Sequence, residues 1–255
     1  MKTIKSYSEK NAIKVIAFGF HFANKISDSE MEDIIEKLKE NDILSNEFKQ
    51  SLTDEISMTI GPYQIPNQKK SVGNILFNKD DIWIINITKE FIVITCKKYS
   101  KWDNIGLKVF EYMDILFSVI TKELNQFTLE YLYEFEILDT QKKWKEKLFN
   151  KDCVYLNNYI LQLSDFWHIN QGSFVEIDDI GHKLLDTLGI KYFADQQDSF
   201  KHKVNIKSQH IALFNNMEKF ENDNFQKYFT SMRDHSKAIF KSIIHKEIVE
   251  KFNKE

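Results

Sequence analysis

The chain has 255 residues, a formal net charge of -3, and a composition of 42% hydrophobic and 29% charged residues. These proportions are typical of a globular protein with a sizeable core, and they exclude a disordered or collagen-like chain. The near-neutral balance offers no general attraction to nucleic acid or to an anionic membrane surface. Arg233 is the only arginine. Because lysine lacks the planar fork with which arginine reads guanine, a sequence-specific DNA reader is not expected.

Compartment and redox state follow from the first residues and from the cysteines. Residues 1–10 are polar and lack the apolar segment of a signal peptide, and no apolar run is long enough to span a membrane. Cys96 and Cys153 are too few for a disulfide framework and too far apart in sequence for a zinc-binding pair. We therefore expect a cytoplasmic protein with no membrane association. The abundance of Lys, Asn and Ile suggests an AT-rich bacterial gene.

The first half of the chain predicts strands interrupted by two helices. Residues 12–23 alternate as a buried strand does, and Ser27 with Glu30 forms a capping box before an apolar helical stripe over 31–38. The only Pro-containing loop falls at 61–71. Three short apolar runs separated by polar turns predict an antiparallel meander over 72–77, 82–87 and 91–96. Helical periodicity follows over 102–120, and the clearest half-buried strand covers 127–137.

The second half predicts further strands and a long final helix. A charged helical linker is expected over 140–149, and residues 215–223 are polar and predict a loop. Apolar patterning predicts strands at 173–177, 183–194 and 202–213, and one apolar stripe over 225–252 predicts a long amphipathic helix. The fold class is therefore α+β, with antiparallel β-sheets on which amphipathic helices pack. We expect two subdomains, 1–139 and 140–255, which would be related halves if the chain arose by duplication.

Three short segments resemble a known family. They are the alternating strand over 13–22, a Tyr-x-x-Trp helix start (Tyr99, Trp102) followed by a Leu-x-Tyr strand from Leu129, and a C-terminal His-x-x-x-x-Phe helix (His235, Phe240). In this order and spacing the chain resembles sporadically distributed, uncharacterised bacterial and archaeal proteins of about its own length. In that family an arginine usually precedes the strand tyrosine, whereas Glu130 stands here. The family carries no assigned activity, and its patchy distribution suggests genes of mobile or anti-phage defence cassettes.

Several enzyme classes are excluded by the glycines and by missing motifs. The seven glycines never cluster, so neither a Walker A loop nor a dinucleotide-binding G-x-G-x-x-G can be built. The serine-hydrolase G-x-S-x-G and the zinc-protease H-E-x-x-H motifs are also absent. No residue set matches a metal-ligand spacing, so we expect no metal and no cofactor.

Weak catalytic candidates remain on one strand, one turn and one helix. Glu130 and Glu134 share a strand face and could hold a divalent cation or act as acid and base, although a solvated face balanced by cross-strand lysines explains them better. Asp178 lies in an acidic turn. Arg233 and His235 lie near the start of the last helix, where a pairing of Arg233 and Asp234 with neighbouring elements is the simpler interpretation. His210, on an apolar strand face, is interpreted as a core or interface histidine.

One basic segment could contact nucleic acid. Aromatic and basic side chains alternate there as single-strand binders require: Lys97, Lys98, Tyr99, Lys101 and Trp102. The buried stripe of the following helix, which Trp102 begins, explains this residue better than nucleic-acid binding does. The leading hypothesis is therefore a non-catalytic protein-binding or regulatory module with a protein partner or a homo-oligomeric state. The alternatives are a carboxylate- and divalent-metal-dependent enzyme, hydrolase or nuclease, and a single-stranded nucleic-acid binder.

Overall fold

The computed structural model describes residues 4–8, 11–40, 49–53, 74–80, 82–138, 140, 143–163, 166–177, 183–194, 201–219 and 221–252. The chain divides into two compact units. Unit 1 contains Met1–Ile16, Thr128–Leu213 and Asp223–Glu255, and unit 2 contains Ala17–Phe127 and Phe214–Asn222. The subdomain boundary expected after residue 139 falls inside unit 1, so the two divisions of the chain differ.

Unit 2 holds the meander and two helices. Its strands are β3 (Lys49–Thr53), β4 (Asn74–Lys79), β5 (Trp83–Ile87), β6 (Phe91–Cys96) and most of β2 (Ile13–Phe22), and they follow one another in that order across the sheet. The three pairings from β3 to β6 are antiparallel. The meander predicted from the apolar runs is therefore confirmed over its described residues. The loop at 61–71 lies outside the described residues.

Two helices accompany the unit 2 sheet. In α1 (Asp28–Glu40), the backbone N–H of Ser27 donates to Glu30 Oε2 at 2.8 Å, so the predicted capping box is present. In α3 (Trp102–Phe117), aromatic rings pack against rings of the strands. The centroid of the Trp102 ring lies 6.0 Å from that of Phe18, and the centroid of Tyr112 lies 5.5 Å from that of Trp83. Burial of these rings accounts for the apolar stripe that predicts the helix.

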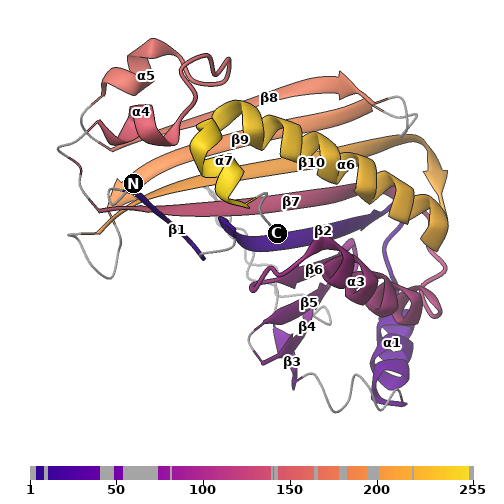
Figure 1. Ribbon diagram of the computed structural model, residues 1–255. Coiled ribbons are helices and arrows are strands. Elements are labelled where there is room, and N and C mark those ends of the chain that lie inside the picture. The colour runs from indigo at the N-terminus through magenta and orange to yellow at the C-terminus, as the bar shows by residue number, and fades with distance from the viewer. Residues whose placement is uncertain are drawn as a thin grey trace, which may run out of the picture. The chain divides into compact units, whose positions relative to one another are not determined.

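Unit 1 is a second antiparallel assembly with one long helix across it. β1 (Ile4–Ser6) pairs with β7 (Leu124–Ile137), and the sheet continues from β7 through β10 (His202–Glu218) and β9 (Lys183–Ala194) to β8 (Trp167–Glu176). α6 (Asn222–Ile243) crosses one face of these strands (Figure 1). The Tyr133 ring of β7 stacks on Phe240 of α6 with 4.3 Å between centroids. The alternating strand predicted over 127–137 is confirmed within β7.

The segment expected to be a linker is instead packed into unit 1. α4 (Trp144–Leu148) buries Trp144 and Leu148, whose exposed fractions are 4% and 0%. Phe149 forms a β-bridge with Ile244, and Leu148 O accepts from the backbone N–H of His245. The expectation of a linker over 140–149 was wrong. The segment is rich in charged residues, but it also carries two large apolar side chains at helical spacing, Trp144 and Leu148, and both are buried.

Further boundaries differ from expectation, among them the start of β8, which lies at Trp167 whereas the sequence predicts that strand only from residue 173. The predicted final helix over 225–252 is divided into α6 and α7 (Lys246–Phe252), because the bridge at Ile244 interrupts helical hydrogen bonding. β10 continues to Glu218, through part of the predicted loop over 215–223. A short helix, α5 (Asn158–Gln162), is added where none was expected.

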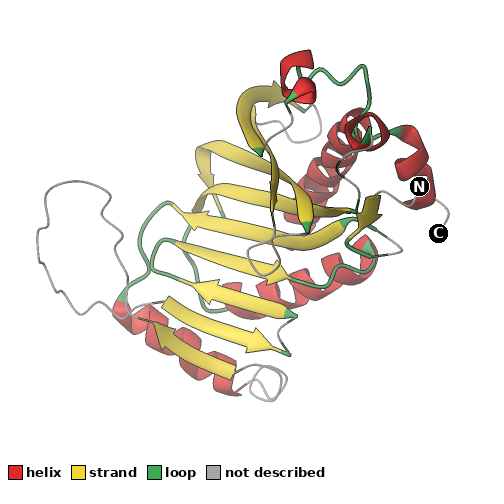
Figure 2. Cartoon of the chain, turned by 90° about the vertical axis from the view of Figure 1, so that its left-hand side faces the viewer, coloured by secondary structure: helices red, strands yellow, loops and turns green. Residues whose placement is uncertain are grey.

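The structure as a whole is α+β, with antiparallel strands and amphipathic helices packed on them (Figure 2), which confirms the predicted fold class. Among the described helices, none combines the length and the apolar character needed to cross a membrane.

Candidate functional site

Three apolar stripes of unit 1 are interrupted by polar residues at the same place. On β9 the inward positions are Leu184, Asp186, Leu188 and Ile190, so Asp186 is the one acid among apolar neighbours. On β10 the stripe of Val204 and Ile206 continues into Ser208 and His210, and on α6 the buried stripe contains Ser236 next to His235. The antiparallel register places His210 directly opposite Asp186.

Asp186 is bound by both histidines through its two carboxylate oxygens. Oδ1 lies 2.7 Å from His210 Nδ1, and Oδ2 lies 2.5 Å from His235 Nε2. The two imidazole rings are 5.4 Å apart and nearly perpendicular. One ligand-type atom from each of the three residues therefore lies within 4.8 Å of the other two.

A serine pair continues the network behind His210. His210 Nε2 lies 2.8 Å from Ser208 Oγ, which lies 3.4 Å from Ser236 Oγ. A hydroxyl can either donate or accept, so Ser208 can satisfy Nε2 in either tautomer of His210. In the contact with Asp186, Nδ1–H donates to the carboxylate oxygen. Because Nε2 can carry the proton and donate to Ser208 instead, the surroundings also permit a tautomer in which the lone pair of Nδ1 is available to a cation.

The burial of the network is uneven. The side chain of His210 is 0% exposed, that of Asp186 is 11% exposed and that of His235 is 26% exposed. Burial alone would raise the pKa of Asp186, but the hydrogen bonds and the electrostatic attraction of His210 and His235 together hold that pKa below its ordinary value. Asp186 is therefore a carboxylate at neutral pH, with one side of the cluster open through His235.

Tyr155 and Ser173 are two further residues near Asp186. Ser173 is the exposed cross-strand partner of Asp186 on β8. The half-buried Tyr155 has a raised pKa, mainly from burial and then from the negative charge of Asp186, so its phenol remains protonated. The segment carrying Tyr155 is fixed to the edge strand, because Gln171 Nε2 donates to Tyr155 O at 3.2 Å.

The carboxylates singled out in the sequence lie on the opposite sheet face. Glu130 accepts from Lys207 at 2.8 Å and from Gln209 at 3.1 Å, while Glu134 accepts from Lys14 at 2.8 Å. Lys207 and Gln209 alternate along β10 with Ser208 and His210, which face α6. Glu130 and Glu134 are therefore bound by lysines of neighbouring strands and are not brought to His235.

Of the remaining catalytic candidates, only His235 joins the cluster. Arg233 Nε donates to Asp234 Oδ1 at 2.9 Å, and Arg233 Nη2 also lies 2.7 Å from that oxygen. Arg233 thus forms an ion pair with the next residue of its own helix, whereas the interpretation from the sequence was a pairing with neighbouring elements. Asp178 lies outside the described residues.

The basic segment considered for nucleic acid lies in unit 2. Lys97, Lys98 and Lys101 are exposed, whereas Tyr99 and Trp102 are half-buried. Because the Trp102 ring packs on Phe18, it is unavailable as an open platform for base stacking. The segment keeps its charge but offers no exposed aromatic side chain.

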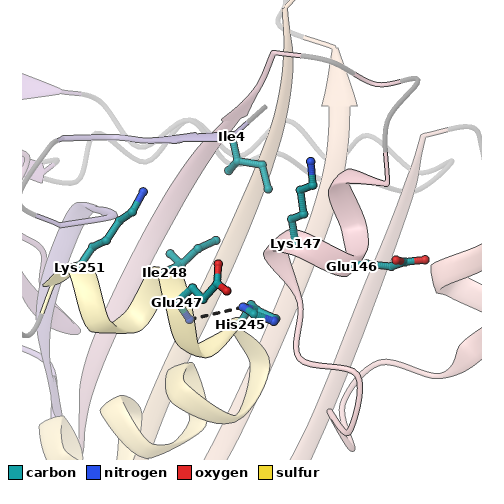
Figure 3. A pocket seen from close by; sticks show the side chains of 7 residues that line it. All are labelled: Ile4, Glu146, Lys147, His245, Glu247, Ile248 and Lys251. Atoms are coloured by element: carbon teal, nitrogen blue, oxygen red, sulfur yellow. Dashed lines mark hydrogen bonds between the residues drawn. The ribbon is translucent and has the colours of Figure 1, made fainter. Parts of the chain in front are cut away.

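A separate pocket of about 290 Å³ lies in unit 1 among β1, α4 and α7 (Figure 3). Lys147, Lys251 and His245 line it together with Glu146 and Glu247, and Ile4 and Ile248 supply its apolar wall. The two carboxylates offset the cationic groups of the lining. The pocket does not include any residue of the Asp186 cluster, which remains the stronger candidate.

Asp186 and Ser208 were not predicted as site residues, and His210 was interpreted as a core or interface histidine. The signal available in the sequence was Asp186 itself. Leu184 stands two residues before it and Leu188 two residues after it, so Asp186 occupies an inward position of an apolar strand. Such a residue requires a partner, because burying an unpaired carboxylate is very costly. The expectation of no metal-ligand set rested on spacing along the chain, whereas the three residues of this cluster come from three different elements.

The chain matches no protein-family model and no curated protein sequence.

Proposed function

We propose that unit 1 binds a divalent first-row transition metal ion through Asp186, His210 and His235 and uses it for hydrolysis. The observation that carries the proposal is the convergence of one carboxylate and two imidazoles, from β9, β10 and α6, within 4.8 Å. This corresponds to the carboxylate-and-hydrolase alternative from the sequence, with a different set of residues except for His235.

The donor set suits such an ion. Two imidazole nitrogens and one carboxylate are ligands of zinc hydrolases and of non-haem iron enzymes. Metal–ligand bonds of about 2.0–2.2 Å separate neighbouring ligand atoms by about 3 Å or slightly more, so the present contacts need to widen by roughly 1 Å or less. The half-exposed His235 can supply that movement.

The residues behind the ligands also suit a metal centre. A ligating histidine normally donates its other ring N–H to a fixed partner, which sets its tautomer. Ser208 supplies that acceptor for His210 Nε2 at 2.8 Å, leaving Nδ1 free to bind an ion. When no ion is bound, the same hydroxyl donates to Nε2 and Nδ1–H donates to Asp186, so both states satisfy the buried groups.

The reaction class follows from the number of ligands. Three protein ligands leave coordination positions for water and substrate, and a bound divalent ion lowers the pKa of such a water toward neutrality. Solvent reaches the cluster at the exposed side of His235. The protonated phenol of Tyr155 lies near enough to Asp186 for the carboxylate charge to raise the pKa of Tyr155. A hydrogen-bond donor beside an activated water is suited to hydrolysis.

The order Ser208–His210–Asp186 also reproduces the hydrogen bonds of a serine hydrolase. Ser208 is 3% exposed, however, and its hydroxyl is shared between His210 and Ser236. A substrate carbonyl would have to displace α6 to reach it. The metal interpretation requires no such displacement.

The test is metal binding by the full chain carrying a tag without histidine. We expect about one ion per chain by elemental analysis after dialysis against Zn²⁺, Mn²⁺, Fe²⁺ or Co²⁺ in turn. His235→Gln and Asp186→Asn should weaken binding by more than about 100-fold, since removal of an outer-shell partner alone costs about 10–100-fold.

His245→Gln is the matched control, because His245 is a half-buried histidine of unit 1 outside the cluster. It should bind metal as the wild type does. Failure of all four ions to bind at micromolar concentration, or wild-type affinity in His235→Gln, would refute the proposal. Metal binding without hydrolysis of ester, amide or phosphoester substrates would refute only the reaction class.

The leading hypothesis from the sequence, a non-catalytic protein-binding module, stays a prediction. Phe166 and Phe174, 55% and 64% exposed beside and within β8, support it. It differs from the metal proposal in expecting a stoichiometric protein partner and no effect of His235→Gln on function.

The free, buried Cys96 and Cys153 favour a reducing compartment, and we propose a cytoplasmic location on that basis.

A further inference from the structure

The strand β8 ends the order of strands in unit 1, and among the described residues β9 is the only strand paired with it. The pairing runs from Trp167 to Glu176 without a bulge. Most of β8 is exposed, including Phe174 at 64%. β8 contains no lysine and no proline, the residues with which natural sheets usually protect an edge. A ten-residue edge with these properties is typical of a strand that pairs with another strand.

Two-fold symmetry restricts how two copies of β8 can pair. Antiparallel residue pairs alternate between hydrogen-bonded and non-hydrogen-bonded types along the ladder. A register in which Gln171 opposes Gly172 would make two neighbouring pairs equivalent by symmetry, although they must differ in type. A symmetric antiparallel dimer must therefore place some residue opposite its own copy.

Centring the pair on Gly172 gives a ladder of nine residues in which every pair except Asn170 with Phe174 is complementary or neutral. His168 then opposes Glu176 of the other copy, Ile169 opposes Val175, and Gln171 opposes Ser173. An imidazole meets a carboxylate at both ends, and branched apolar side chains meet each other between them. Centring on Ser173 instead opposes Asn170 to Glu176 and shortens the ladder, so Gly172 is the better centre.

We infer that β8 is a homodimer interface in which two copies of the chain pair antiparallel about Gly172. Opposed residues of an antiparallel pair point to the same sheet face, so both copies of α6 lie on one face of the joined sheet. Ser173, the cross-strand partner of Asp186, then lies opposite Gln171 of the second copy. The inference does not depend on metal binding.

The first test is the mass of the full chain by sedimentation and light scattering across micromolar concentrations, where we expect a dimer. Gly172→Lys places two like charges opposite each other at the symmetry axis and should give a monomer, as should Gly172→Asp. Mixed in equal amounts, these two variants should form a heterodimer. Recovery on mixing is expected only if residue 172 faces its own copy.

Gly172 tolerates a side chain, since a Cβ there would meet its nearest neighbour, Asp186 O, at 3.4 Å. Gly172→Ala should therefore stay dimeric. Leu107→Lys, at a position 72% exposed on α3, is the matched control for added charge and should also stay dimeric.

A second measurement needs no variant: amide exchange in residues 167–176 should slow as the wild-type concentration rises. A wild-type chain that is monomeric at every concentration would overturn the inference. A dimer that survives Gly172→Lys with unchanged exchange in β8 would do so as well, because the interface would then lie elsewhere.

Discussion

Asp186 shows how much of the candidate site depends on single residues. Its charge is buried in an apolar strand face and is stabilised by two imidazoles, each on a different element. Removing one partner of such a buried charge is strongly destabilising, whereas the intact network contributes little net stability. A residue set of this kind is therefore poorly explained by stability alone, which favours a functional role.

The hydroxyl of Ser208 permits a prediction at the same scale. Ser208→Ala leaves the buried Nε2 of His210 without its partner, so we expect a loss of about 1–3 kcal/mol in the free energy of unfolding. If His210 also binds an ion, affinity should fall by about 10–100-fold. Denaturant unfolding and metal competition titrations measure the two effects separately.

Ser236→Ala provides the comparison. Ser236 Oγ reaches Ser208 only at 3.4 Å and does not touch a histidine, so its removal should have the smaller effect on both quantities. Equal effects of the two substitutions would contradict the assigned order of the network.

Residue-scale prediction from sequence reached His235 but not its partners. Periodicity shows that Asp186, His210 and Ser208 face inward, yet it does not show which inward residues meet. That depends on the register of β9 against β10 and on the rotation of α6, both set by tertiary packing. Glu130 and Glu134 were chosen as candidates because they lie on one face of the same strand. The candidate site is instead assembled from residues of β9, β10 and α6, which are far apart in the sequence.

At the scale of elements, alternation and helical stripes predicted most of the fold. β7, β9 and α3 lie where their patterns place them, because each buries one continuous face. The helical character of α4 was expected, but its burial was not, because two apolar side chains in a five-residue helix are too few to show a stripe among charged residues. The break between α6 and α7 comes from the bridge of Ile244 to Phe149, a contact made across the chain that leaves no local mark.

The start of α1 gives a prediction about pH. The hydrogen bond from the Ser27 backbone N–H, aided by the Ser27 hydroxyl and by Lys122, lowers the pKa of Glu30 below its ordinary value of 4.5. A lowered pKa in the folded state stabilises the protein above the unfolded pKa, and this contribution is lost as pH falls through the folded pKa. Glu30→Gln should therefore cost about 0.5 kcal/mol at neutral pH and nothing in acid.

The measurement is the difference in unfolding free energy between wild type and variant, taken from neutral pH to below pH 4.5. Glu36→Gln, later in α1, is the control and should show little difference at any pH, because the effect of helix-end charge is confined to the first turn. A cost of Glu30→Gln that stays constant into acid would rule out the carboxylate as its source.

At the scale of the whole molecule, every residue of the proposed centre belongs to unit 1. A ligand that binds only the folded state stabilises by about 2.7 kcal/mol at a concentration 100-fold above its Kd. With metal bound, amide exchange should slow in β9, β10 and α6 while β5 and β6 of unit 2 stay unchanged. His235→Gln should remove the effect. Uniform slowing in both units would show that the ion acts elsewhere.

Unit 1 is assembled from three separate stretches of chain, and this has a consequence for how the protein is made. Lys14 and Glu134 pair across 120 positions, and His235 meets Asp186 across 49. While the ribosome delivers the chain from its N-terminus, β1 has no partner until β7 emerges, and the pair of histidines is incomplete until α6 follows. Metal capture would then be a late step of biogenesis, in which a nascent chain holding only Asp186 and His210 is still unable to retain the ion.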